Sequence, residues 1–231
     1  MTEKRLEING SPAVLYGDGA DDVWLYVHGR SAYKEVAADF AAMAVPRGAQ
    51  VLAIDLPGHG ERKAQAADMT PWHMTGELRA LADWARERWG RVSLRADSIG
   101  AFFSLMALEG AGLQKSLLVS PVLDMEKLIG KMMVWAGVTE EELREKKIIP
   151  TAFGEDLSWE YLQYVRAHPI ASWGSPTAIL YAGRDELTDR ETVEDFAGRF
   201  GCALTVMEDG EHWFHTPEQL EALRRWTEES L

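Results

Sequence analysis

Two spacings of apolar residues alternate along the chain. Short continuous apolar runs between turn residues are typical of buried strands, whereas apolar residues repeated every three or four positions are typical of amphipathic helices. The runs predict strands at 22–28, 50–55, 91–96, 116–120, 176–183 and 202–208. The periodic segments predict helices at 31–44, at 98–110, from Pro71 past Leu81, from Thr188 to Phe200 and from Thr216 onward. Repeated strand–helix units indicate an α/β fold with a mostly parallel, doubly wound sheet covered by helices on both faces.

Capping residues mark several of the predicted helix starts. In a capping box, the side chains of two residues three apart each bond to the other's backbone N–H. Three pairs have that spacing: Thr139 with Glu142, Thr188 with Glu191, and Thr216 with Gln219. Thr70 precedes Pro71, which suits the first position of a helix. Gly110 is expected to end the helix at 98–110.

The alternation of strands and helices is interrupted at residues 122–172, which carry helical signals but no clear strand. No Pro- or Ser-rich linker flanks this stretch, so residues 1–231 are expected to form a single domain with 122–172 as a helical insertion. We call 122–172 the cap segment. It begins where the strand at 116–120 ends, and it should therefore lie over the carboxyl edge of the sheet, where open α/β sheets hold their ligands.

Composition narrows the classes of partner. The 231 residues carry a net charge of −13, which repels nucleic acids and anionic membrane surfaces. The single cysteine, Cys202, cannot form an intramolecular disulfide. No stretch has the apolar core of a signal peptide or the length of about 20 apolar residues that a membrane span needs. We therefore expect a cytoplasmic protein that acts on a small molecule, with its oligomeric state left open.

The stretch ADSIG at 96–100 places a serine between a predicted strand and a predicted helix. Gly100 and the small Ala96 leave room for a sharp turn, which is the pattern of a nucleophile elbow with alanine in the place of its first glycine. The alternative is that Ser98 is an ordinary helix cap. Asp97 does not fit as the nucleophile, because Ile99 would then occupy the position that needs glycine.

A serine nucleophile needs a base, and the base needs an acid to orient it. Asp185 follows the strand at 176–183, and His212 follows the strand at 202–208, so each lies at the carboxyl end of a strand. Asp189 and Asp124 are weaker alternatives for the acid. His215, next to a helix cap, is a weaker alternative for the base.

N–H donors for a developing oxyanion are expected after an early strand. The strand at 22–28 ends at His28, and Gly29 allows the backbone to turn so that the N–H of Arg30 can face the pocket together with that of Ile99. The Arg30 side chain has two possible roles. It could hold a substrate carboxylate, or it could pair with an acidic residue of the protein and take no part in chemistry.

The chain resembles the α/β-hydrolase superfamily in five segments that cover most of its length: YVHGR, DLPGHGER, ADSIGAFFS, YAGRDEL and GEHWFHT. The resemblance implies an oxyanion hole in the first segment and a triad of Ser98, Asp185 and His212. It also implies that the cap segment shapes the substrate pocket. Histidine 59, in the second segment, is expected to be structural.

These features predict a serine hydrolase that cleaves a carboxylic ester of a small molecule through an acyl-enzyme intermediate. No Cys/His ligand cluster, phosphate-binding loop or dinucleotide fingerprint is present, so we expect no metal and no cofactor. A thioesterase, an amidase and a C–C bond hydrolase share the same triad, and a noncatalytic binder shares the same fold. The residues expected to bind substrate are Gly29, Arg30, Met132, Trp135, Trp159 and Tyr164.

Overall fold

A single mixed sheet forms the centre of the protein in the computed structural model, which describes residues 1–231. Its eight strands lie in the order β1-β2-β4-β3-β5-β6-β9-β10, and every neighbouring pair from β4 onward is parallel. The strands are β1 (Glu3–Ile8), β2 (Ser11–Tyr16), β3 (Asp22–Val27), β4 (Ala49–Ile54), β5 (Arg91–Asp97), β6 (Ser116–Val119), β9 (Thr177–Ala182) and β10 (Ala203–Met207). The prediction of a mostly parallel α/β sheet is confirmed.

The β1–β2 hairpin was missing from the predicted strands. Strand β1 lies at the sheet edge and is mostly exposed and polar, so it has no apolar run. It pairs antiparallel with β2 through a two-residue turn, in which Asn9 (φ 52°) and Gly10 (φ 83°) are both left-handed. An Asn-Gly pair is the preferred sequence for this turn, so Asn9-Gly10 was the sequence signal that could have predicted the hairpin.

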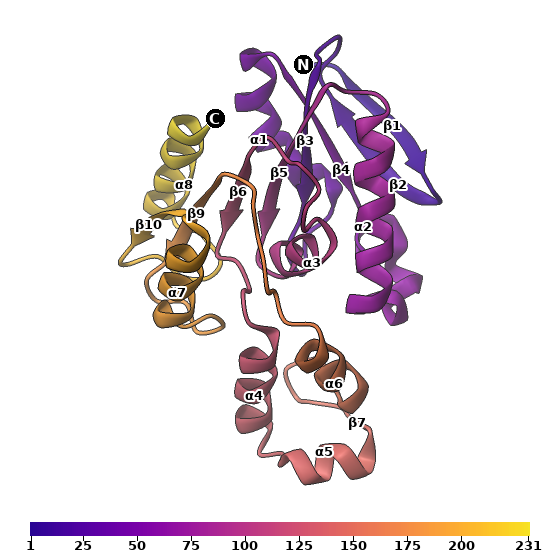
Figure 1. The fold of residues 1–231 in the computed structure, drawn as a ribbon, viewed down its shortest axis with the longest axis vertical. Coiled ribbons are helices and arrows are strands. Elements are labelled where there is room, and N and C mark those ends of the chain that lie inside the picture. Colours follow the sequence, from indigo (N-terminus) through magenta and orange to yellow (C-terminus); the bar gives the residue numbers. More distant parts are fainter.

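Helices cover both faces of the sheet (Figure 1). Buried side chains of α1 and α8 pack on one face, and those of α2, α3 and α7 pack on the other. The helices are α1 (Ala37–Ala44), α2 (Pro71–Arg86), α3 (Ile99–Ala107), α7 (Arg190–Phe200) and α8 (Pro217–Ser230), with short 3-10 helices η1 (Lys34–Val36), η2 (Val45–Arg47) and η3 (Gly60–Asp68). No helix combines the length and apolar character needed to cross a membrane.

Two predicted helices are shorter in the structure. Helix α1 starts at Ala37 rather than at residue 31. The N–H of Lys34 donates to the side chain of Asp55 at 2.8 Å instead of to a helical carbonyl, and residues 34–36 form the 3-10 helix η1. Helix α3 ends at Ala107, before the glycine that was expected to stop it. The Thr188–Glu191 capping box was also wrong: α7 begins at Arg190, and the Thr188 hydroxyl donates to the Pro121 carbonyl instead.

The cap segment extends from the carboxyl ends of the parallel strands (Figure 1). It contains α4 (Met125–Ala136), α5 (Glu140–Lys146), a short ribbon of β7 (Ile148–Ile149) and β8 (Leu157–Ser158), and α6 (Trp159–Ala167). The predicted Thr139–Glu142 capping box opens α5. Buried leucines of all three helices join the core on the α2 and α3 side of the sheet, so the cap segment packs on the sheet domain.

Candidate active site

Ser98 lies in a strained turn between β5 and α3. Its φ of 51° and ψ of −121° are unfavourable for any residue other than glycine, and such strain costs about 1–3 kcal/mol. Backbone hydrogen bonds hold the turn: the Ser98 N–H donates to the Val119 carbonyl at 3.0 Å, and the Val122 N–H donates to the Ser98 carbonyl at 3.1 Å. Ala96 is fully buried beside it.

The structure brings Ser98, His212 and Asp185 together. Ser98 Oγ lies 2.8 Å from His212 Nε2, and His212 Nδ1 lies 2.6 Å from Asp185 Oδ2. The Asp185 side chain is fully buried, and its second oxygen accepts the N–H groups of Leu187 and Thr188. The side chain of Ser98 makes no helix-capping bond. Its hydroxyl is therefore directed at the histidine, as a nucleophile requires, and not at the helix.

The alternative acids and base lie elsewhere. Asp124 caps α4 by accepting the Lys127 N–H, and Asp189 pairs with Lys131 at 2.6 Å. His215 Nδ1 contacts the Trp213 carbonyl at 2.6 Å. None of the three residues bonds to the Ser98–His212 pair.

The loop after β3 lies against Ser98. A Cβ at Gly29 would stand 3.2 Å from Ser98 Cβ, so only a residue without a side chain fits at this distance without displacing its neighbour. The N–H groups of Arg30 and Ile99 have no acceptor within the protein. Two free donors on the segments that flank the serine are what an oxyanion hole needs.

His28 fixes the shape of this loop. The ring is fully buried, its Nδ1 lies 2.7 Å from the Gly29 carbonyl, and its Nε2 accepts the Leu56 N–H at 3.1 Å. Nδ1 must then carry the proton, and the ring is neutral. Burial lowers the pKa of His28 from 6.5 to about 4. His59 stands edge-on to this ring, with its Nδ1 2.9 Å from the Pro57 carbonyl.

The Arg30 side chain pairs with Glu155 of the cap segment. Pairing with an acidic residue was one of the two contacts considered for the Arg30 side chain, and it joins the loop of Gly29 and Arg30 to the cap segment. Partial burial lowers the pKa of Arg30. Glu155 was missed in the sequence, because it stands in an irregular loop whose position depends on the packing of the whole cap segment.

The predicted substrate-binding residues of the cap segment divide into two groups. Met132 and Trp159 are half-buried and pack against the core. Trp135 is 50% exposed and meets Phe153 edge-on, while Tyr164 stacks on His168 at 4.2 Å and meets Trp72 at 5.4 Å. The contacts of Trp135 and Tyr164 are thus with other aromatic side chains of the protein.

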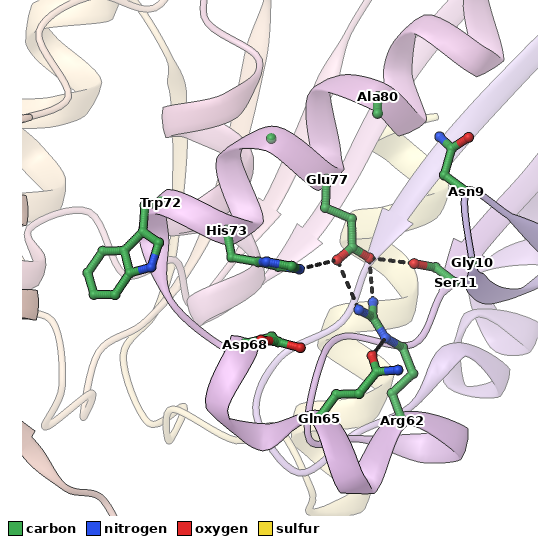
Figure 2. A pocket seen from close by; sticks show the side chains of 11 residues that line it. Asn9, Gly10, Ser11, Arg62, Gln65, Asp68, Trp72, His73, Glu77 and Ala80 are labelled. Atoms are coloured by element: carbon green, nitrogen blue, oxygen red, sulfur yellow. Dashed lines mark hydrogen bonds and ion pairs between the residues drawn. The ribbon is translucent and has the colours of Figure 1, made fainter.

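A surface cavity of about 600 Å³ lies between the β1–β2 turn, η3 and α2, and it is not lined by Ser98, Asp185 or His212 (Figure 2). At its centre Glu77 accepts hydrogen bonds from Arg62 and from the Ser11 hydroxyl, and His73 lies 3.3 Å from the same carboxylate. Because these charged groups satisfy one another, the cluster ties the hairpin and η3 to α2.

Comparisons of sequence and structure gave different results. No family model and no curated protein matches the sequence. Solved structures match over almost their whole length. Est1E from Butyrivibrio proteoclasticus, with ferulic acid bound, has a TM-score of 0.76 at 16% identity, covering 98% of this chain and 96% of that one. Alpha/beta hydrolase domain-containing protein 10 from mouse has a TM-score of 0.80 at 12% identity, covering 99% and 98%.

A third match has the same fold and is named as a thioesterase. The thioesterase domain from the curacin biosynthetic pathway has a TM-score of 0.62 at 17% identity, covering 98% of this chain and 99% of that one. At such low identities the likeness establishes a common fold.

Proposed function

We propose that this chain, which has the α/β-hydrolase fold, is a serine hydrolase that cleaves a carboxylic ester of a small molecule. The observation that carries the proposal is the continuous contact from Ser98 Oγ through His212 to Asp185, at 2.8 and 2.6 Å, with the serine in a strained turn. A helix cap would need neither the histidine contact nor the strain.

The arrangement supports a two-step mechanism. His212, oriented by Asp185, takes the proton of Ser98 as the hydroxyl oxygen attacks the ester carbonyl. The N–H groups of Arg30 and Ile99 stabilise the oxyanion of the tetrahedral intermediate. His212 then gives the proton to the departing alcohol and leaves an acyl-enzyme. A water molecule, deprotonated by His212, attacks the acyl carbon, and release of the carboxylic acid restores Ser98.

The cap segment is proposed to cover the substrate over the carboxyl edge of the sheet. Its loop reaches the loop of Gly29 and Arg30 through the Arg30–Glu155 pair, and its half-buried Met132 and Trp159 offer apolar surface for a substrate. One structural match, Est1E, has ferulic acid bound, and another is named as a thioesterase domain, so the bond cleaved is the first question for experiment.

Turnover of p-nitrophenyl esters of increasing acyl length tests the proposal. We expect Ser98→Ala to lower kcat by at least about 10⁴-fold. The matched control is Ser172→Ala, which removes a serine hydroxyl, bonded to Glu109, from an exposed position before β9. A fluorophosphonate should label wild type and Ser172→Ala but not Ser98→Ala.

Equal turnover by wild type and Ser98→Ala would refute the assignment. No turnover together with no labelling would favour the noncatalytic binder. Acyl-thioester and anilide substrates in the same assay separate the thioesterase and amidase alternatives, since the preferred bond gives the highest kcat/KM.

A further inference from the structure

Asp97, the residue directly before Ser98, takes part in a buried network on the α1 and α8 face of the sheet. The Tyr26 hydroxyl donates to Asp97 Oδ2 at 2.6 Å, and Arg95 Nη2 lies 3.0 Å from Asp97 Oδ1. Burial, and then the Asp97 carboxylate, hold the pKa of Tyr26 well above its ordinary value, so the phenol remains protonated and keeps donating. We call Tyr26, Arg95 and Asp97 the elbow network.

Arg95 is an unusual residue for this position. Its side chain is only 5% exposed, with its guanidinium 5.8 Å from the centre of the Phe40 ring and 5.7 Å from that of Trp226. Its Nε and Nη1 have no hydrogen-bond partner. A buried cation with unfilled donors costs stability that an apolar side chain in the same space would not. Stability alone therefore gives no reason for the network.

The elbow network joins β3, which leads to the proposed oxyanion donor Arg30, to β5, which leads to the proposed nucleophile Ser98. Tyr26 belongs to β3, and Asp97 ends β5. In the parallel pairing of these strands, Tyr26 lies opposite Arg95 and Val27 opposite Ala96. The Tyr26–Asp97 bond thus links the strands at the level where the nucleophile and the proposed oxyanion donors diverge from the sheet.

The strained turn of Ser98 needs support on both sides, because such a conformation persists only where its surroundings fix it. On the carboxyl side, Gly100 allows the helix to approach the carbonyls of Val27 and His28, and the Val122 N–H holds the Ser98 carbonyl. On the amino side, the neighbouring side chain is that of Asp97. Its Oδ2 accepts the Tyr26 hydroxyl, and its Oδ1, which accepts no hydrogen bond, is held by the charge of Arg95 at 3.0 Å.

We propose that Asp97, held by Tyr26 and Arg95, is a positioning residue that sets Ser98 relative to the Arg30 and Ile99 N–H groups. This proposal rests on the proposed serine-hydrolase function. Asp97 contacts no reacting atom. Asp97 keeps the Ser98 hydroxyl at a position from which it can attack the carbonyl carbon while the carbonyl oxygen binds the two N–H groups. A displacement of about 1 Å from such a position lowers the reaction rate about 10²-fold.

Tyr26→Phe is the decisive variant, because it removes one oxygen from the elbow network and no charge. We expect kcat for a p-nitrophenyl ester to fall about 10- to 100-fold, with KM within about twofold of wild type. The rate of fluorophosphonate labelling should fall in parallel. Asp97→Asn keeps an oxygen that can accept from Tyr26, so its loss of kcat should be smaller than that of Asp97→Ala.

Tyr16→Phe is the matched control, since Tyr16 is a buried tyrosine packed in the same cluster of side chains and its hydroxyl has no partner in the protein. Its kcat should match that of wild type. A Tyr26→Phe enzyme with lowered Tm but unchanged kcat and labelling rate would overturn the positioning role and leave the serine-hydrolase proposal intact. A wild-type protein that neither turns over esters nor reacts with the fluorophosphonate would overturn both.

Discussion

Gly100 lies where the start of α3 packs against the backbone of Val27 and His28. A Cβ at this position would stand 2.4 Å from the His28 carbonyl oxygen and 2.6 Å from that of Val27. Both are backbone atoms, so the chain itself would have to move. We expect Gly100→Ala to lower the free energy of unfolding by about 1–3 kcal/mol, and to abolish ester turnover by moving the loop of Gly29 and Arg30.

Gly76→Ala provides the comparison for Gly100→Ala. Gly76 lies within α2, and a Cβ there would meet nothing within 4 Å. Alanine should raise stability by about 0.5–1 kcal/mol through its higher helix propensity, with activity unchanged. Urea unfolding and ester turnover measure both effects. An active Gly100→Ala enzyme would mean that the close packing of α3 on β3 is not required.

His28 makes the stability of the protein depend on pH. Its pKa is about 4 in the folded protein and 6.5 in an unfolded chain, so between these values the unfolded state binds the proton more readily. The contribution of His28 is complete above pH 6.5 and is lost as the pH falls through 4. The difference corresponds to about 3 kcal/mol.

The variant His28→Gln isolates this effect, because its amide oxygen can accept the Leu56 N–H but does not titrate. Urea unfolding at pH 7, 5.5 and 4 should show a steeper loss of stability in wild type than in His28→Gln. Parallel pH dependences would show that the ring is not held neutral by its two backbone contacts.

At the scale of elements, predictions from the sequence succeeded where the signal is local. The six predicted strands are all present, and Ser98, Asp185 and His212 follow β5, β9 and β10, as their positions at strand ends indicated. Helix starts were less predictable. Thr188 has the spacing of a cap, yet its hydroxyl bonds to the Pro121 carbonyl, which is distant in sequence.

Partners that are distant in sequence could not be predicted. Nothing near Arg30 identifies Glu155 as its partner, and nothing near Asp97 identifies Tyr26, since tertiary packing makes each pair.

An ion pair between Arg30 and Glu155, whose side chains are 50% and 32% exposed, joins the loop of Gly29 and Arg30 to the cap segment. Ion pairs that remain accessible to water contribute about 1 kcal/mol at most, so Glu155→Gln should leave global unfolding almost unchanged. We expect a local effect instead: amide hydrogen exchange at residues 150–156 should become up to about fivefold faster, as about 1 kcal/mol of local stability permits.

Glu160→Gln, on the exposed side of α6 and without an ion pair, should show wild-type exchange. Arg30→Gln should reproduce the effect of Glu155→Gln, and the double variant should add nothing further, because both substitutions remove the same contact. Additive effects would show that the pair does not hold the cap loop.

At the scale of the whole molecule, a buried ion pair between Lys34 and Asp55 connects β4, η1 and η3. Lys34 Nζ lies 2.7 Å from Asp55 Oδ2, and their side chains are 2% and 0% exposed. The same carboxylate accepts the N–H of Lys34, in η1 before α1, and that of Glu61, in η3, and it follows the end of β4. Gly60 (φ 50°) leaves the space that the carboxylate fills.

Removing this carboxylate should destabilise the entire fold, because it leaves a buried ammonium with fewer partners. We expect Asp55→Ala to cost about 3–5 kcal/mol, a large part of the 5–15 kcal/mol typical of a folded domain. Replacing Lys34 by methionine in the same chain should recover part of the loss, since no buried ammonium then remains. Urea unfolding at pH 7 measures each variant. If Asp55→Ala unfolds like wild type, the pair does not join β4, η1 and η3, and the packing of apolar side chains alone holds these layers together.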